Sequence, residues 1–422
     1  MLSLQYIREN VDRVKRDVLL RNATAPIDRI LQLDEERREL LQQVEALRAR
    51  RNAVSKAIGA SKDAAGRDER IAEMRVVGDE INQLDARLKA VETELQAKLY
   101  EVPNILDPSV PRGPDETSNE VVAVVGSIPE FSFAPRPHWE LGELVNGLDI
   151  ERGAKMSGSR FYTLRGPLAK LQRALIQLML DEHSKAGFTE SYLPYMLSEA
   201  SLYAAGQLPK FRDNLYRDAE EDYFFIPTAE VAFVNLYRDE IIPPGQLPMR
   251  FVGHTPCFRR EKMSAGRDVR GIKRGHQFEK VEMFVYCEPE QSGEELEALL
   301  VRACSIPEKL GLPYRVLALC SGDIGFNSTK TFDLEIWAPG QGEWLEVSSA
   351  SNCLDFQARR ANIRYRTAAD APTAYPHMLN ASGLALPRTL IAVMENYQRE
   401  DGSIGVPEAL QSYMGIDVIP AV

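Results

Sequence analysis

The segment from Thr255 to Lys280 holds an arginine, a carboxylate and an aromatic residue around a glycine-containing loop. It reads TPCFRREKMSAGRDVRGIKRGHQFEK, which predicts a strand ending near Arg259 and Glu261, a polar loop, and a strand returning through Phe278. A guanidinium can hold a phosphate by two parallel hydrogen bonds, a carboxylate can accept from an exocyclic amine, and an aromatic ring offers an apolar face to a base. Such a hairpin can therefore close around a nucleotide.

Each of these side chains, taken alone, has a more ordinary explanation. Arg–Glu pairs two residues apart are usually surface ions, and a strand phenylalanine usually lies in the core. The chain carries neither the GxGxxG nor the GxxxxGK[ST] pattern that cradles phosphates in other nucleotide-binding proteins. A nucleotide site in this protein would thus have to rest on arginines and carboxylates.

Short apolar segments predict the strands that would position this hairpin. They are FVGHTPCF, KVEMFVYC, YRVLALC, TFDLEIW and EWLEVSSA, and they alternate with helical stretches such as Leu168–Lys185 and Glu294–Leu310. Several strands follow one another without an intervening helix, which favours an antiparallel sheet flanked by helices over a βαβ repeat. Together with a helical N-terminal segment, this pattern predicts an α+β protein.

Residues 28–99 carry two heptad patterns, the first between Asp28 and Gly59 and the second between Met74 and Leu95. The apolar positions are Ile30, Leu33, Leu40, Val44, Leu47, Val54 and Ile58, and then Met74, Val77, Ile81, Leu84, Leu88, Val91 and Leu95. Two such helices joined by a short glycine-containing loop are expected to fold back antiparallel, because each offers the other a matching apolar stripe. The result would be a coiled-coil arm about 45–50 Å long.

The expected tip of this arm is basic, although the whole chain has a net charge of −11. The tip carries Arg48, Arg50, Arg51, Lys56, Lys62 and Arg67 against Asp63 and no glutamate. Clustered cations release counterions from a polyanion, so contact with nucleic acid is one interpretation. A spacer or dimerisation hairpin with solvated charges is the other interpretation and, from this segment alone, the commoner case.

The length and composition of the chain indicate how these segments are organised. A length of 422 residues predicts two domains, an N-terminal one at 1–102 and a second at 138–422, joined by a proline-rich linker at 103–137. No apolar run reaches the roughly 20 residues that a membrane span needs. The N-terminus has no apolar signal region, so a cytoplasmic protein without a membrane partner is expected. Five cysteines without CxxC or paired Cys/His spacing predict reduced thiols and no zinc site.

Several motifs together resemble the seryl-tRNA synthetases, a family of class II aminoacyl-tRNA synthetases. TPCFRRE with AGRDVRG and HQFEKVE is similar to their motif 2, ASGLALPRTLIAVMENYQ to motif 3, GFTESYLPYMLSEASLYAAGQLPKF to the motif 1 region, and FIPTAEV to the serine-binding TAE loop. The resemblance runs essentially end to end and includes the arm. It implies a class II catalytic domain, L-serine, ATP and Mg²⁺ as ligands, tRNA(Ser) as acceptor with tRNA(Sec) where one exists, and a homodimer.

The resemblance also implies a role for each matching residue. Those implied to bind serine are Thr228, Ala229, Glu230, Arg259, Glu282, Asn380 and Ser382. Those implied to bind ATP are Arg259, Arg260, Glu261, Arg274, Gly275, Phe278, Glu346, Val347, Ser348, Ser349 and Arg388. Within these sets, Glu346 and Ser349 would coordinate Mg²⁺, and Arg259, Glu261 and Arg388 would be catalytic. The six basic residues of the tip would bind tRNA.

Three places depart from the family pattern, and two other functions stay open. Lys262–Met263 follow FRRE, Pro387 precedes Arg388, and Tyr375–Pro376 precede His377. Neutral drift is the favoured interpretation, and a specialised paralogue is the alternative. The chain could instead be a ligase that delivers activated serine to a carrier protein or metabolite, or an inactive RNA-binding homologue. The basic-tipped arm argues against the ligase, and the full set of charged motif residues argues against the inactive homologue.

Overall fold

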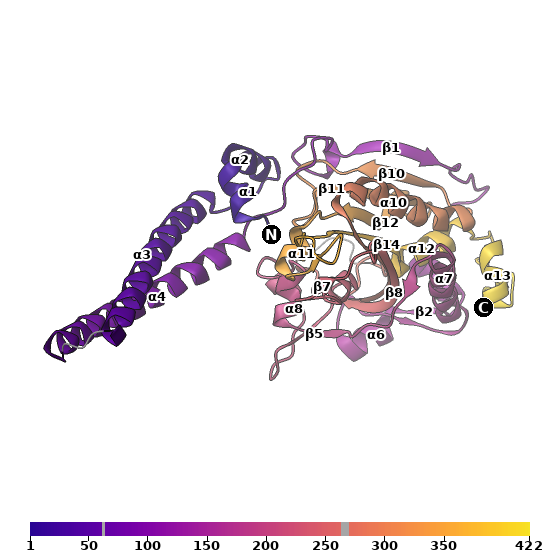
Figure 1. Ribbon diagram of the computed structural model, residues 1–422. Helices are drawn as coiled ribbons and strands as arrows, with labels where there is room; N and C mark the ends of the chain where they lie inside the picture. The colour runs from indigo at the N-terminus through magenta and orange to yellow at the C-terminus, as the bar shows by residue number, and fades with distance from the viewer. Residues whose placement is uncertain (61–63, 263–269) are drawn as a thin grey trace. The chain divides into compact units, whose positions relative to one another are not determined.

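The computed structural model describes residues 1–60, 64–262 and 270–422, with residues 59–60 and 64–67 described as backbone only. The chain divides into two compact units (Figure 1). The smaller unit comprises Leu2–Leu19 and Ala23–Pro103, and the larger comprises Met1, Leu20–Asn22 and Asn104–Val422. Among the described residues, no helix combines the length and the apolar character that a membrane span requires.

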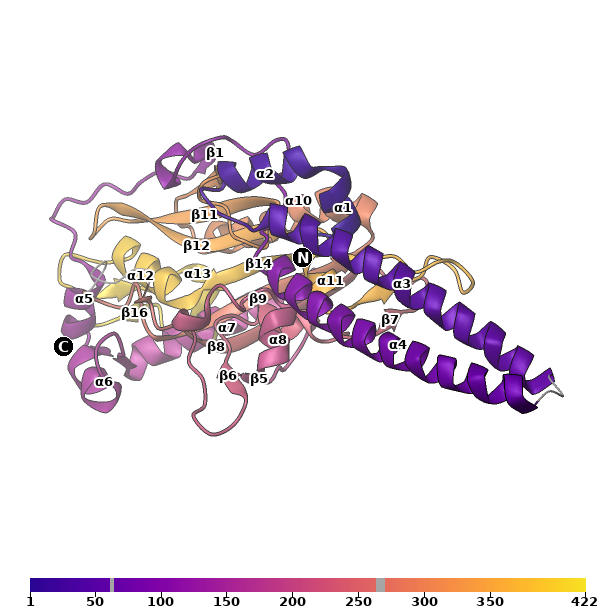
Figure 2. The same ribbon diagram turned by 90° about the vertical axis from the view of Figure 1, so that its left-hand side faces the viewer.

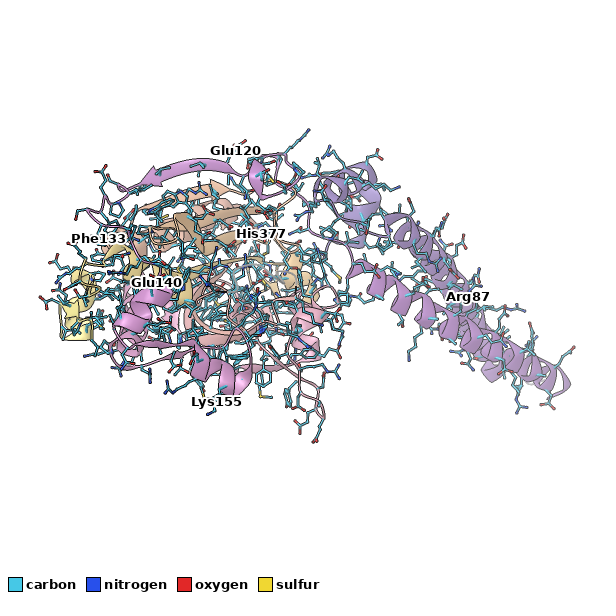
Figure 3. All side chains as sticks on the ribbon, turned by 180° about the vertical axis from the view of Figure 1, so that it is seen from behind. Arg87, Glu120, Phe133, Glu140, Lys155 and His377 are labelled. Carbon is cyan, nitrogen blue, oxygen red and sulfur yellow. The ribbon has the colours of Figure 1, made fainter. Side chains whose placement is uncertain are left out.

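The smaller unit confirms the prediction of two long paired helices. Short helices α1 (Leu4–Glu9) and α2 (Val11–Leu20) precede α3 (Ile27–Ala60) and α4 (Ala64–Leu99). Ten described apolar side chains of the helix pair are buried. Eight occupy predicted heptad positions, namely Ile30, Leu33, Leu40, Val44, Val77, Ile81, Val91 and Leu95, and the other two are Ile27 and Leu99 at the ends of the pair. Ion pairs Arg29–Glu94 at 2.8 Å and Arg87–Glu36 at 2.6 Å join the helices in antiparallel register, and Figure 3 labels Arg87 on α4.

The larger unit is built on an eight-stranded sheet in the order β1-β10-β11-β12-β14-β9-β8-β4. All neighbouring strands pair antiparallel except β4 with β8. The strands are β1 (Glu120–Val125), β4 (Thr189–Glu190), β8 (Met249–Phe258), β9 (Gln277–Cys287), β10 (Tyr314–Ala318), β11 (Lys330–Ala338), β12 (Glu343–Asn352) and β14 (His377–Ala385). The five predicted strands are confirmed as β8, β9, β10, β11 and β12, while β14 lies in a segment that was not predicted as a strand.

Helices α7 (Gly166–Lys185), α10 (Ser292–Lys309) and α12 (Leu386–Asn396) pack on one face of this sheet (Figure 2). The first two confirm the predicted helices at 168–185 and 294–310 within two residues at each end. The main apolar core lies between these helices and alternate residues of the strands, such as Val281, Met283 and Val285 of β9. Because side chains alternate along a strand, the residues between them point to the opposite face.

The segment predicted as a linker contributes to the sheet. Strand β1 lies within residues 103–137 and pairs with β10, and Figure 3 labels Glu120 at its start. All six β1 side chains are exposed. Part of the predicted linker is therefore an edge strand of the larger unit.

The remaining elements are short. They are α5 (His138–Leu144), β2 (Leu148–Asp149), α6 (Ile150–Ser157), β3 (Thr163–Leu164), β5 (Met196–Ser198), α8 (Glu199–Ala204), β6 (Tyr223–Phe225), α9 (Glu230–Val234), β7 (Ile241–Ile242), α11 (Phe356–Arg360), β13 (Arg364–Tyr365), β15 (Ile404–Gly405), α13 (Glu408–Met414) and β16 (Val418–Ile419), with 3₁₀ turns at Glu116–Ser118, Arg212–Asn214 and Pro289–Gln291.

Candidate active site

A cavity of about 370 Å³ opens on the sheet face opposite the helices. It brings together most of the residues that the sequence predicted to bind serine, ATP and Mg²⁺. Those lining it are Thr228, Glu230, Arg259, Glu261, Arg274, Gly275, Phe278, Glu282, Glu346, Val347, Ser349, Asn380, Ser382 and Arg388. Ala229, Arg260 and Ser348 do not line it.

Strand geometry explains why distant residues meet on this face. Phe278 and Glu282 lie at even spacing on β9, so their side chains share one side of the sheet. Glu282 pairs across the ladder with Ser382 of β14, and Asn380 pairs with Ser351 of β12. Residues opposite each other in adjacent strands face the same side. Three strands thereby present polar side chains to one cavity.

The three predicted residues that stay outside have separate reasons. Ala229 is fully buried, and the Arg260 guanidinium lies 5.7 Å from the centre of the Tyr216 ring. Tyr216 does not line the cavity, so this contact holds the Arg260 side chain away from it. Ser348 is buried, and its hydroxyl donates to the Ser382 carbonyl at 2.6 Å. The structure thus places these three side chains outside the cavity, and their assignment to ligand binding stays a prediction.

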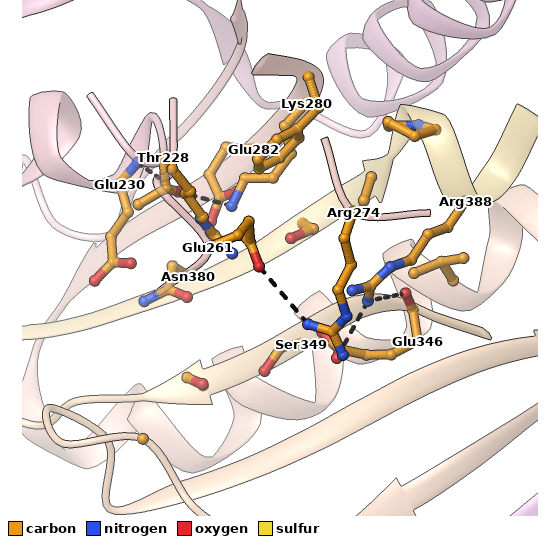
Figure 4. A pocket seen from close by; sticks show the side chains of 18 of the residues that line it. Thr228, Glu230, Glu261, Arg274, Lys280, Glu282, Glu346, Ser349, Asn380 and Arg388 are labelled. Atoms are coloured by element: carbon orange, nitrogen blue, oxygen red, sulfur yellow. Dashed lines mark hydrogen bonds and ion pairs between the residues drawn. The ribbon is translucent and has the colours of Figure 1, made fainter. Parts of the chain in front are cut away.

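One end of the cavity, here called the carboxylate end, consists of Thr228, Glu230, Lys280, Glu282 and Asn380 (Figure 4), together with Ser382, which pairs with Glu282 across the ladder. Lys280 was not predicted as a site residue. Its Nζ lies 2.7 Å from the Thr228 hydroxyl and 2.5 Å from Glu282 Oε2. Both charged side chains of this ion pair are buried. The even spacing of Phe278, Lys280 and Glu282 was the signal that could have found it.

Glu230 lies deep in the carboxylate end. Burial is the larger cause, and repulsion from the nearby Glu282 carboxylate the smaller one, of a Glu230 pKa that is raised to about 7. The side-chain amide of Gln357 donates to Glu230 Oε1 at 2.6 Å and favours the charged form. Glu230 is therefore poised to change charge near neutral pH, and a cationic ligand beside it would hold it ionised.

The opposite end, here called the arginine end, consists of Glu261, Arg274, Glu346, Ser349 and Arg388 (Figure 4). Arg388 pairs with Glu346 Oε2 at 3.3 Å and also donates to the Glu346 carbonyl at 2.6 Å. Arg274 lies 3.9 Å from Glu261 Oε2. Glu261 has a φ of 49°, a left-handed conformation that costs energy for a residue with a side chain. The backbone therefore turns at Glu261, and its carboxylate points in a direction that differs from that of a side chain in an extended strand.

Arg259 lies next to the carboxylate end. Its Nε donates to the Pro227 carbonyl at 3.1 Å, and its guanidinium carbon lies 5.2 Å from the centre of the Phe278 ring. Two contacts on different sides of the guanidinium fix its plane, while the remaining N–H groups can reach a ligand. Arg259 can therefore contact an anion bound in the cavity.

Glu346 and Ser349 suit a small divalent cation. Both line the cavity and supply oxygen atoms, the ligands that Mg²⁺ prefers. Mg²⁺ usually takes only one or two protein oxygens and completes its octahedron with phosphate and water. The two residues therefore fit a Mg²⁺ ion that arrives with a nucleotide.

All three family departures can be placed except at Met263. The Tyr375 ring lies with its centre 4.3 Å from the Arg359 guanidinium carbon. Pro387 stands in the first turn of α12, where a missing N–H costs little, and both Pro387 and Arg388 line the cavity. Lys262 is exposed, and its backbone N–H donates to the Asn214 side-chain oxygen at 3.2 Å. Met263 lies outside the described residues.

The predicted nucleic-acid contacts at the arm tip divide into two groups. Arg48 pairs with Asp85 at 2.8 Å, and Arg50 pairs with Glu73, so the opposite helix partly offsets their charge. Arg51 and Lys56 are exposed, and none of the described acidic residues pairs with them. Lys62 and the side chain of Arg67 lie outside what the structure describes.

Comparison with known proteins agrees with this geometry. Residues 1–106 match the seryl-tRNA synthetase N-terminal domain, and residues 210–397 match the tRNA synthetase class II core domain (G, H, P, S and T). The chain is 58% identical to the serine–tRNA ligase of Roseiflexus sp. (strain RS-1), over 99% of both chains. It is 55% identical to the serine–tRNA ligase of Thermomicrobium roseum, over 98% of this chain and 94% of the relative.

A solved structure gives the same result. The chain is similar to seryl-tRNA synthetase from Pyrococcus horikoshii complexed with ATP, with a TM-score of 0.94, 37% identity and complete coverage of both chains. The similarity therefore extends over the arm helices as well as the sheet that carries the cavity. On this sequence identity and coverage, the chain belongs to the seryl-tRNA synthetase family.

Proposed function

We propose that this chain activates L-serine with ATP, forming seryl-adenylate and pyrophosphate, and then transfers serine to the 3′-terminal adenosine of tRNA(Ser). The observation that carries the proposal is a single cavity with carboxylates at one end and arginines at the other. The carboxylate end suits the ammonium group of serine, and the arginine end suits the phosphates of ATP. The relatives that are named serine–tRNA ligase support the same assignment.

The first chemical step brings two anions together. The serine carboxylate attacks the α-phosphate of ATP, an O–P bond forms, and the bond to the departing pyrophosphate breaks. In the proposed arrangement Arg259 contacts both the carboxylate and the α-phosphate, and Arg388 takes the far end of the triphosphate. Fixed positive charge lowers the barrier most where water is excluded and the groups are already oriented. Bound by Glu346 and Ser349, Mg²⁺ would screen the phosphate charge.

The proposed partners follow from the same assignment. We propose that the arm binds tRNA(Ser), with Arg51 and Lys56 as the described cations best able to contact phosphate, and that tRNA(Sec) is served where one exists. We further propose a homodimer with the motif 1 region at its interface, acting in the cytoplasm where charged tRNA is used. The assigned domains are the arm domain at 1–102 and the catalytic domain at 138–422, with strand β1 joining the latter.

Serine binding should depend on pH through Glu230. Since its pKa is raised to about 7, the carboxylate is charged above that pH and neutral below it, and a neutral side chain holds the substrate ammonium less well. The kcat/KM for serine, which reports the free enzyme, is expected to fall about tenfold for each pH unit below that value. Initial rates across the pH range check this. The variant Glu230→Gln should be less active and should lose this pH dependence; if it kept the wild-type profile, the titrating group would be another residue.

The first test of the function is amino-acid-dependent ATP–pyrophosphate exchange with each of the twenty amino acids, followed by charging of purified tRNA(Ser). Exchange with serine and efficient charging are expected. Exchange without charging would favour the ligase that serves a carrier protein or metabolite, and absence of exchange would favour the inactive homologue. Each outcome selects one of the three candidate functions.

A further inference from the structure

Two fully buried polar residues, His138 and Glu395, contact each other away from the cavity. His138 is the first residue of α5, and Glu395 lies in the last turn of α12. The His138 backbone N–H donates to Glu395 Oε1 at 2.9 Å, and the His138 Nδ1 atom lies 3.1 Å from the same oxygen. Both side chains have 0% exposure. Burying such a pair costs folding free energy unless each polar group makes a hydrogen bond. The remaining hydrogen bonds of the two side chains therefore indicate their role.

The other ring nitrogen of His138 receives a hydrogen bond from the segment that leads into the arginine end. The Ile272 backbone N–H donates to His138 Nε2 at 3.1 Å. A backbone N–H can only donate, so Nε2 must carry the lone pair and Nδ1 must carry the proton. Glu395 accepts from Nδ1 and thereby fixes the ring in the one tautomer that can hold Ile272.

Glu395 also ties the β11–β12 turn to this pair. Its Oε2 accepts from the Gly340 backbone N–H at 2.9 Å, and its Oε1 accepts from the Gln341 side chain at 3.1 Å. The Gly271 backbone approaches the ring closely, because a Cβ at that position would lie 2.0 Å from His138 Nε2. The segment therefore sits against the imidazole in a way that only glycine permits at residue 271, where φ is +73°.

Residues just after Ile272 line the arginine end. The Lys273 carbonyl accepts from Arg388 Nε at 3.5 Å, and Lys273, Arg274 and Gly275 all border the cavity. Displacement of Ile272 would move these groups together, since they follow it directly in the chain. In the carboxylate end, Lys280 and Glu282 lie further along the chain on β9, where pairing with β8 and β14 holds them in place, and the other residues come from different segments.

We propose that His138 and Glu395 are positioning residues for ATP, acting through Ile272 on Lys273, Arg274 and Arg388. Neither touches the substrate. The proposal rests on the assignment of the arginine end to ATP in the proposed function, and it predicts that disturbing the pair weakens ATP binding while serine binding stays unchanged.

The variant His138→Asn separates the two hydrogen bonds of the ring. Its side-chain amide can still donate to Glu395 from the place of Nδ1, but it has no atom at the place of Nε2 to accept from Ile272. The KM for ATP in pyrophosphate exchange is expected to rise at least about tenfold, with less than about a twofold change in the KM for serine. The matched control, Gln341→Ala, removes another donor to Glu395 without touching Ile272 and should leave both values near those of wild type.

A second variant covers the case in which His138→Asn does not fold. Gly271→Ala keeps both His138 and Glu395 but forces the segment away from the ring, and the same selective rise in the KM for ATP is expected. Calorimetric titration with ATP alone gives the dissociation constant for ATP without serine. If the wild-type protein itself did not bind ATP, the proposed function would be wrong, and this result would differ from a failure of the positioning role. Parallel changes in both KM values, or no change in either, would overturn the positioning role.

Discussion

The variant Arg259→Ala is expected to lose serine-dependent ATP–pyrophosphate exchange by about 10³-fold or more, because no other residue is assigned to contact both reacting anions. The effect should appear mainly in kcat, since the guanidinium is needed most when charge shifts during the reaction. Exchange assays at saturating serine and ATP measure it. Stability should fall by only about 1 kcal/mol, the worth of the hydrogen bond to the Pro227 carbonyl.

Arg260→Ala is the matched control for this variant. It removes the same chemical group from the neighbouring residue, whose guanidinium lies over the Tyr216 ring and does not line the cavity. Exchange should stay within about twofold of wild type. If the two variants lost activity equally, the division between these neighbouring arginines would be wrong and a general loss of positive charge would explain both.

Deleting residues 49–67 from the arm is expected to abolish charging of tRNA(Ser) while serine-dependent exchange stays near normal. The reason is that the cavity lies wholly in the larger unit, whereas the deleted residues belong to the smaller one. A milder double variant, Arg51→Ala with Lys56→Ala, should weaken charging and reduce the dependence of tRNA binding on log[salt] by about two phosphate contacts. Charging and exchange assays on the same preparation, with a salt titration of tRNA binding, check these results.

The double variant Arg29→Ala with Arg87→Ala also removes two positive charges from the arm. Both of these arginines already pair with glutamates across the helices, so their loss should change the salt dependence little. Loss of exchange in the deletion variant would contradict the separation of the two activities. A salt dependence that changes equally in both double variants would contradict a specific role for Arg51 and Lys56.

Predictions from the sequence worked best where a local pattern determines the result. The apolar runs predicted β8–β12, and the heptads predicted the paired helices, because each depends on residues close together in the chain. Strand β1 was hidden between prolines and polar residues in a segment that looked like a linker. Its side chains are exposed, so it lacks the buried alternation that marks most strands.

The sequence does not reveal the features of the cavity that depend on tertiary contacts. Lys280 binds Thr228, a residue 52 positions away, and nothing near Lys280 in the sequence indicates that partner. Glu230, the first residue of α9, acquires its raised pKa from burial and from Glu282, which lies 52 positions later on β9. Resemblance to a motif assigns Arg260 and Ser348 along with their neighbours, but it cannot indicate that their side chains lie outside the cavity lining.

A single irregularity in β14 has a consequence for how this family can vary in length. The pairing of β14 with β9 shifts between Ser382 and Leu384, so that Leu384 enters the core and Ala385 borders the cavity. If Gly383 paired as an ordinary strand residue, the alternation would continue, and Leu384 would follow Asn380 and Ser382 into the cavity. Gly383 is thus the extra residue of a β-bulge, and the side-chain alternation of β14 shifts by one position after it. Surface loops can gain or lose residues at little cost, but a residue gained or lost elsewhere in β14, without a bulge to absorb it, would exchange side chains that line the cavity with side chains of the core.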